Sequence, residues 1–419
     1  MPPFWPGSSR NRIRPLLGLI GLGCGLRLVL WLVSLGSYDV VAWRIFASSV
    51  SDVGLGETYV RFQGEESPFN HPPTMALLAS WIFRLSEATG IEFARLFKLP
   101  ALAAELVTGL LLYRVWHRRR DVETGLAAAA AYALALSAIL ISGYHGNTDA
   151  VYFCLVFAAA YLMEERRSPL GAGLVMGAAL NVKLIPLVCA LPLASRLMRV
   201  RDIGRYALGG ALGAAPFIAA YLSFGTDARR AFLGSVFAYR SFPDNWGVEM
   251  WVRLTRALAD TVSEVPGYIV RILGGVYGAH GGELVLIASA AFAWWHFTRS
   301  RRDGEARFDA YELVALGFVL FLLLTPGFAV QYVGGVVAPL IATGIRRGVV
   351  VATVTGAFIT ALYAFFVVDW SPILSVHGPM PDAFTPLSMA AWLVLLWAGR
   401  GLVRSGGGGA QGAEPGSSI

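Results

Sequence analysis

Long apolar runs separated by short polar connections recur along almost the entire chain. Many of these runs hold roughly 18 or more residues with few charges, and a helix of that length crosses a hydrocarbon layer of ~30 Å. A soluble protein also has an apolar core, but it does not repeat uncharged helical runs of that length. The pattern predicts an all-α, polytopic integral membrane protein with about twelve transmembrane helices. The expected spans are residues 15–36, 95–116, 122–142, 149–163, 169–182, 184–198, 206–225, 279–298, 308–325, 329–345, 348–368 and 384–403.

Two long polar segments, residues 37–94 and 226–278, interrupt this series of spans. Within the first, residues 72–86 are apolar, but the stretch is short and contains Arg84. If it crossed the membrane, the basic residues that follow the next span would lie on the wrong side. We therefore expect a juxtamembrane or re-entrant helix on the outer face, with two consecutive prolines in its first turn.

The first outer segment contains another helical stretch, residues 41–53, which we expect to lie in the membrane interface with Trp43 and Phe46 as anchors. Residues 1–403 are interpreted as one transmembrane domain. The remaining tail, residues 404–419, is rich in glycine and polar, and it is predicted to be disordered.

Hydrophobic residues make up 56% of the chain and charged residues 15%, against about 25% charged in ordinary soluble domains. The net charge of +7 arises from short basic clusters at every second connection, which is the positive-inside pattern of membrane proteins. The basic excess is therefore a topology signal that places both termini inside, and no nucleic-acid partner is expected. The three cysteines lie within apolar runs, so no disulfide framework is expected.

Once the topology is fixed, many polar residues fall at the outer boundary of the membrane. Either they are ordinary loop residues or they form a site there. They are Asp39, His71, His145, Asn147, Asp149, Lys183, Gln331, Tyr332 and His377.

Asp39 follows the first span directly. It is either a cap of the interfacial helix that begins near Val40, worth about 1 kcal/mol, or a general base that takes a proton from an acceptor hydroxyl.

Lys183 lies where two apolar runs meet. A lysine at that depth is costly unless it snorkels to the interface or binds an anion, and a lipid phosphate is the natural functional partner. Arg27 and Glu105 lie inside the first two spans, and we expect them to form a structural ion pair.

The chain contains no HExxH motif or cysteine pair of a metal site, and no glycine-rich nucleotide signature in a strand–helix setting. We therefore expect no metal and no cofactor. Because no stretch is long enough for a soluble nucleotide-sugar domain, the donor of any group transfer should be lipid-soluble.

Several short motifs follow one another in a fixed order on the outer side. The first loop begins with Asp39-Val40-Val41-Ala42-Trp43, continues through Ala47, Gly56 and Tyr59, and closes with Phe69-Asn70-His71-Pro72-Pro73. Later landmarks are Gly143-Tyr144-His145-Gly146-Asn147, Lys183-Leu184-Ile185-Pro186, Asn245-Trp246-Gly247 and Thr325-Pro326-Gly327-Phe328-Ala329-Val330-Gln331-Tyr332. This order resembles the GT-C superfamily of membrane glycosyltransferases. Within it, the chain is similar to polyprenol-phosphate-mannose-dependent mannosyltransferases, including those of mycobacterial phosphatidylinositol mannoside synthesis.

The resemblance implies an inverting transfer of a sugar, expected to be mannose, from a polyprenyl-phosphate donor to a lipid or glycan acceptor. Asp39 would be the catalytic base, and Lys183, with His145 as the second candidate, would bind the donor phosphate. Many members carry a paired acidic motif in the first loop, whereas Val40 and Val41 follow Asp39 here, which puts a metal requirement in doubt. Substrate-binding roles would fall to His71, Asn147, Gln331, Tyr332 and Trp246, although interfacial tryptophans also serve as membrane anchors.

The alternative is a carrier or flippase of a lipid-linked sugar, which needs similar polar residues without bond making. Such proteins have internal repeats and broken spans near the midplane. Here the two long outer segments differ, and the polar residues gather at one face, which favours an enzyme. The resemblance implies that this enzyme lies in the bacterial plasma membrane with an extracytoplasmic active site.

Overall fold

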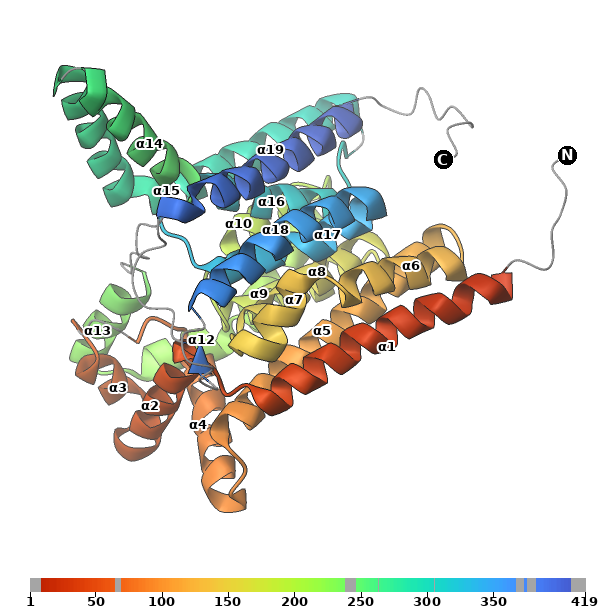
Figure 1. Ribbon diagram of the computed structural model, residues 1–419. Helices are drawn as coiled ribbons and strands as arrows, with labels where there is room; N and C mark the ends of the chain where they lie inside the picture. The colour runs from red at the N-terminus through yellow and green to blue at the C-terminus, as the bar shows by residue number, and fades with distance from the viewer. Residues whose placement is uncertain are drawn as a thin grey trace, which may run out of the picture.

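The computed structural model describes residues 9–64, 69–237, 246–262, 264–304, 306–366, 373–374 and 382–407. These residues are overwhelmingly helical, as expected (Figure 1). The first half contains α1 (Ser9–Val33), β1 (Gly36–Ser37), α2 (Tyr38–Val53), α3 (Leu55–Arg61), α4 (Pro73–Thr89), α5 (Phe93–Arg119), α6 (Val122–Ala133), α7 (Leu136–Ile139), the π-helix η1 (Leu140–His145), α8 (Asp149–Glu164), α9 (Pro169–Leu180), α10 (Leu187–Ala194) and α11 (Val200–Gly213). The second half contains α12 (Ala215–Ser223), α13 (Thr226–Val236), α14 (Gly247–Val262), α15 (Glu264–Asp303), α16 (Ala310–Leu324), the 3-10 helix η2 (Val330–Val336), α17 (Val337–Thr343), α18 (Ile345–Phe366), β2 (Ile373–Leu374), the 3-10 helix η3 (Asp382–Phe384) and α19 (Thr385–Gly407).

The expected count of twelve spans is not supported. Within the described ranges, five helices are long and apolar enough to cross a membrane, or seven if each of two bent helix pairs forms one span. The five are α1, α5, α15, α18 and α19, and the bent pairs are α6 with α7–η1, at 56°, and α11 with α12, at 49°. These seven coincide with seven of the expected spans.

The other five expected spans form helices too short for a hydrocarbon layer that needs about 20 helical residues. α16 has 15 residues and α9 has 12, for example, and most of the side chains of α16 are buried. Many of their apolar residues pack inside the bundle, although Leu170, Leu174 and Leu191 are exposed. Hydropathy alone does not separate such core helices from helices that face lipid.

The first outer segment forms α2, α3 and α4, as its two helical stretches predict. Pro73 occupies the first turn of α4, where a proline sacrifices no hydrogen bond. The three helices lie together with α12 and α13 at the end of the bundle where α1 ends (Figure 1). The second outer segment forms α13, α14 and the start of α15, while residues 238–245 lie outside the described ranges. At the C-terminus, α19 continues to Gly407, beyond the expected start of the disordered tail.

Helices α9 and α11 meet at backbone distance because each has two glycines four residues apart on the contact face. A Cβ at Gly173 or Gly177 would lie 2.0 or 2.2 Å from a carbonyl oxygen of α11, and one at Gly209 or Gly213 would lie 2.1 or 2.0 Å from a carbonyl oxygen of α9. Small residues at this spacing let membrane helices pack closely. The contact positions the C-terminus of α9, from which the loop that contains Lys183 departs.

Buried cations occupy places where helices break. Arg27 pairs with Glu105 at 2.9 Å, as expected, and its guanidinium also donates to the carbonyl of Ala133 at 2.5 Å. Ala133 ends α6 at the first bend, where the helix leaves carbonyls without intrahelical partners. The guanidinium of Arg27 therefore also satisfies a carbonyl at the break between α6 and α7.

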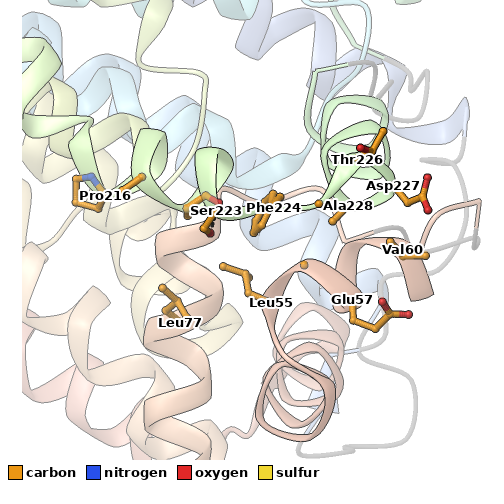
Figure 2. Close-up of a pocket in the computed structure, with 14 residues that line it drawn as sticks. Leu55, Glu57, Val60, Leu77, Pro216, Ser223, Phe224, Thr226, Asp227 and Ala228 are labelled. Atoms are coloured by element: carbon orange, nitrogen blue, oxygen red, sulfur yellow. Dashed lines mark hydrogen bonds between the residues drawn. The ribbon is translucent and has the colours of Figure 1, made fainter.

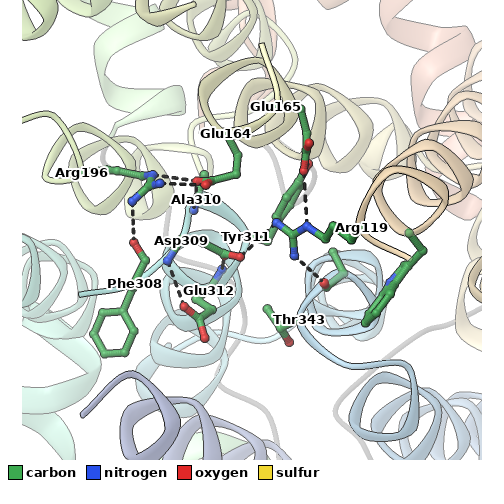
Figure 3. A network of polar contacts seen from close by, with 12 residues as sticks. Arg119, Glu164, Glu165, Arg196, Phe308, Asp309, Ala310, Tyr311, Glu312 and Thr343 are labelled. Atoms are coloured by element: carbon green, nitrogen blue, oxygen red, sulfur yellow. Dashed lines mark hydrogen bonds and ion pairs between the residues drawn. The ribbon is translucent and has the colours of Figure 1, made fainter. Parts of the chain in front are cut away.

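At the end of α8 farthest from Asp149, a second group of charges joins four segments (Figure 3). Arg196 binds Glu164 at 2.7 Å, and Arg119 contacts Glu165 at 3.4 Å and Asp309 at 3.2 Å. These contacts connect α5, the C-terminus of α8, the segment after α10 and the start of α16. They fix one end of the bundle while the polar cluster described below lies at the other.

The α9–α11 contact predicts that Gly177→Ala lowers the free energy of unfolding by about 1–3 kcal/mol, because the added methyl group overpacks two backbones. Gly204→Ala is the matched control in α11, since nothing lies within 4 Å of its added Cβ. That variant should be neutral or slightly stabilising. Thermal unfolding in detergent measures both, and equal midpoints for the two variants would contradict the prediction.

Candidate active site

Asp39 lies in the first turn of α2, and Ser37 is the N-cap of that helix. The Ser37 hydroxyl accepts a hydrogen bond from the backbone N–H of Asp39 at 3.2 Å. Because Ser37 caps the helix, the carboxylate of Asp39 is not used as a cap. The capping interpretation of Asp39 is therefore wrong, and its side chain is available for other contacts.

The carboxylate of Asp39 meets two donors from the segment between α7 and α8. His145 Nε2 lies 3.1 Å and Asn147 Nδ2 lies 2.6 Å from the same oxygen, Oδ2. Among the described residues, none donates a hydrogen bond to Oδ1. The side chain of Asp39 remains 44% exposed, whereas His145 and Asn147 are buried. One oxygen is thus held in place and the other is accessible.

A buried lysine fixes the two segments that meet here. Lys98 of α5 donates to the carbonyl of Ser34, just after α1, at 2.6 Å and to that of Gly143 in η1 at 3.0 Å. Its stem packs against Gly146, where a Cβ would lie 2.8 Å from Lys98 Cδ and where φ is +75°. A glycine suits this position because it adopts a left-handed conformation without strain and leaves room for the lysine. Lys98 thereby sets the distance between Asp39 and His145.

His145 has a second partner, Tyr363 of α18, whose hydroxyl lies 2.5 Å from Nδ1. An ionised carboxylate only accepts hydrogen bonds, so the proton toward Asp39 is on Nε2. In a neutral imidazole, Nδ1 then accepts from the Tyr363 hydroxyl. No pattern in the sequence points to Tyr363, because it lies in an apolar run and meets His145 only through helix packing.

Lys183 forms an ion pair within the protein. Its ammonium lies 2.8 Å from Asp149 Oδ1, and Asp149 is fully buried while the lysine side chain is 17% exposed. The ring of Tyr332 lies 4.7 Å from the same nitrogen. Asp149 Oδ2 is buried without a hydrogen-bond partner. Lys183 therefore does not simply snorkel to the interface, and its charge is already balanced by a carboxylate.

Asp39 and His71 lie outside the membrane-spanning helices, and the pKa of each is shifted. The protein atoms around Asp39 raise its pKa, but the hydrogen bond and charge of His145, then Lys183 and Asn147, outweigh this and hold the pKa at about 2. Burial and the charge of Lys183 lower the pKa of His71 to about 3, although Asp39 opposes the shift. At neutral pH, Asp39 is ionised and His71 is uncharged.

His71 lies beside this cluster, and its ring packs against that of Trp43. Its ring centroid is 4.3 Å from that of Trp43, and its Nδ1 is buried without a hydrogen-bond partner. The hydroxyl of Tyr59 donates to the His71 carbonyl at 2.5 Å, which fixes the backbone. The two expected residues of η2, Gln331 and Tyr332, are buried.

Trp246 does not face the cluster. Its ring stacks on Phe328 at 4.1 Å, its Nε1 donates to the carbonyl of Leu322 at 2.7 Å, and its side chain is buried. It packs as a core residue, so the structure does not present its face to a sugar.

His377 and Asn245 lie outside the described residues. In the described ranges, no three His, Cys, Asp or Glu side chains are grouped closely enough to hold a metal ion.

The pairing of Lys183 with Asp149 predicts that each single replacement, Lys183→Met or Asp149→Leu, destabilises the protein by about 3–5 kcal/mol, because an unpaired charge remains buried. The double variant should recover most of that loss. Thermal unfolding of the four proteins in detergent gives the coupling free energy. Additive losses in the double variant would show that the two charges do not depend on each other.

The model of glycosyltransferase family 87 matches residues 69–326, which is more than half of the chain. The match includes His71, His145, Asn147 and Lys183, while Asp39 precedes it. Together with the apolar helices, it supports a multi-pass membrane enzyme that transfers a glycosyl group, with a sugar donor and an acceptor as substrates. The chain belongs to glycosyltransferase family 87.

Proposed function

We propose that this protein transfers a sugar, which we take to be mannose, from a polyprenyl-phosphate donor to a lipid or glycan acceptor. The reaction takes place on the extracytoplasmic face of a bacterial plasma membrane. The observation that carries the proposal is the position of Asp39, with one carboxylate oxygen held by His145 and Asn147 and the other accessible. A base at a membrane boundary needs this combination of fixed orientation and access.

In the proposed step, an acceptor hydroxyl attacks the anomeric carbon of the donor from the face opposite the phosphate. The new glycosidic C–O bond forms as the bond from the anomeric carbon to the phosphate oxygen breaks, so the configuration inverts. The hydroxyl proton passes to Asp39 Oδ1, and polyprenyl phosphate leaves with the bonding electron pair. No further reactant is required.

Because of its low pKa, Asp39 is ionised at neutral pH and is a weak base. It accepts the proton as the new C–O bond forms, when the attacking hydroxyl becomes acidic. His145 and Asn147 hold the carboxylate, and Tyr363 holds His145 in turn. Both ring nitrogens of His145 are therefore engaged, and we assign His145 to positioning the base rather than to binding the donor phosphate.

Lys183 is the cation that we propose for the donor phosphate, on which negative charge grows as it leaves. Because Asp149 already balances it, the phosphate would share the ammonium with that carboxylate. His71, Asn147, Gln331 and Tyr332 would orient the sugars, while Trp246 retains only a packing role.

Asp39→Asn should lower turnover by about 10²–10⁴, the range of a lost general base, while the donor still binds. Asp52→Asn is the matched control, because Asp52 belongs to the same helix and is exposed. Purified protein is incubated with a polyprenyl-phosphate sugar and an acceptor lipid, and product is measured by mass spectrometry. Normal turnover in Asp39→Asn would remove Asp39 from the mechanism, and donor movement without any product would favour a flippase.

The pH dependence offers a separate test. Asp39 loses its charge only as pH falls through about 2, and His71 gains a proton only near pH 3. Neither group titrates between pH 5 and 8, so His71→Asn should change the magnitude of kcat/KM but not its pH dependence over that range. Loss of an acid limb in this variant would contradict the assignment of a neutral His71.

A further inference from the structure

Two hollows of different character lie away from the cluster around Asp39. The larger one, of about 960 Å³, lies between α3, α4, α12 and α13 (Figure 2). Glu57 and Asp227 line it, and the side chain of Asp227 is 83% exposed, so this hollow opens to water. The smaller one is a pocket of about 280 Å³ between α1, α5 and α6. Helices α1 and α5 are candidate membrane spans and α6 is part of a bent one, so this pocket lies at membrane depth.

The smaller pocket is lined mainly by aliphatic and small residues. Helix α5 contributes Leu106 and Gly109, and α6 contributes Leu126 and Ala129. Gly109 leaves part of the space open, because a Cβ there would meet only a ring carbon of Tyr132, at 3.9 Å. An apolar cavity of about 150 Å³ stays dry and binds small hydrocarbons. A pocket of this size and lining therefore suits a longer hydrocarbon.

Two leucines that line the pocket also face its surroundings. Leu106 is 60% exposed and Leu110 is 48% exposed. Their neighbour Glu105 follows the start of α5 at Phe93 by a distance of about 18 Å along the helix. A hydrocarbon layer of ~30 Å keeps lipid headgroups away from that depth. The part of a lipid that reaches the pocket is therefore its hydrocarbon chain.

The polar end of the pocket does not require a charged ligand. Arg27 and Glu105 form this end, and they pair with each other at 2.9 Å. Because the two charges balance, an uncharged chain can fill the pocket without breaking the pair. An empty pocket would instead deprive its walls of dispersion contacts.

Arg27 connects the pocket to the segment that contains His145. Its guanidinium donates to the carbonyl of Ala133, which lines the pocket and ends α6. Its backbone packs against η1, where a Cβ at Gly143 would lie 3.3 Å from the Cα and the carbonyl oxygen of Arg27. Gly143 precedes His145 by two residues. Whatever fills the pocket therefore supports the helix break that leads to His145.

We propose that the pocket between α1, α5 and α6 binds one acyl chain of a membrane phospholipid, and that the bound chain stabilises the segment from the break after α6 to His145. Phospholipid is the occupant that a bilayer supplies in excess, so even weak binding fills the pocket. The inference does not depend on the sugar donor or on the transfer reaction.

The first test detects the chain itself. Gly109→Leu places a side chain in the pocket, and Gly18→Leu is the matched control, since nothing lies within 4 Å of its added Cβ and it does not line the pocket. The proteins are illuminated in nanodiscs that contain phosphatidylethanolamine with a diazirine in the middle of one acyl chain. Adducts on Cys24 and Glu105, which line the pocket, should fall about tenfold in Gly109→Leu and persist in Gly18→Leu.

Two outcomes of this labelling would overturn the site. One is an equal yield of these adducts in the native protein and both variants. The other is displacement of the label by decaprenyl phosphate but not by unlabelled phosphatidylethanolamine, which would make the occupant an isoprenoid chain.

A second test measures the coupling to His145 without any substrate. The delipidated native protein, in a detergent whose rigid steroid body cannot enter the pocket, should exchange the backbone amides of residues 134–147 about tenfold faster than after phosphatidylethanolamine is added. Gly109→Leu should exchange them slowly with or without lipid, because the leucine replaces the chain. Exchange in the native protein that does not respond to lipid would overturn the coupling. A lack of sugar transfer would count against the proposed reaction alone.

Discussion

The ammonium group of Lys98 is the interaction on which the candidate site depends. It joins the carbonyl of Ser34, at the exit of the first span, to that of Gly143, in the π-helix that precedes Asn147. Asp39 and its two hydrogen-bond donors belong to segments more than a hundred residues apart in the sequence. A fully buried cation that satisfies carbonyls from both segments aligns them.

Other buried cations follow the same principle. Arg27 satisfies a carbonyl at the bend of a broken span while it pairs with Glu105, and Lys183 pairs with Asp149 where α9 ends. A charge in a membrane protein is costly unless it has partners, and a helix break offers carbonyls that also lack partners. The contacts of Arg27 provide partners for both the charge and a carbonyl. Irregular backbone, which the chemistry needs, thereby becomes stable inside an apolar bundle.

The sequence predicted the helical class, the helices of the first loop and the gathering of Asp39, His145, Asn147 and Lys183, because each of these residues lies near an end of an apolar run. It did not predict the role of Tyr363, which meets His145 only through the packing of helices 218 residues apart. It overcounted spans, since hydropathy is equally high for helices buried among other helices. It also assigned Trp246 to a sugar, although nothing in a sequence tells a ring stacked on Phe328 from one that faces a ligand.

The short parallel pairing of Gly36 and Ser37 with Ile373 and Leu374 has a consequence for biosynthesis. The residues next to Asp39 leave the ribosome more than 300 residues before their strand partner is made. At ~5–20 residues per second, the interval is on the order of tens of seconds. Until then the nascent chain lacks this pairing, and until residue 363 is made it also lacks the Tyr363 hydroxyl that contacts His145.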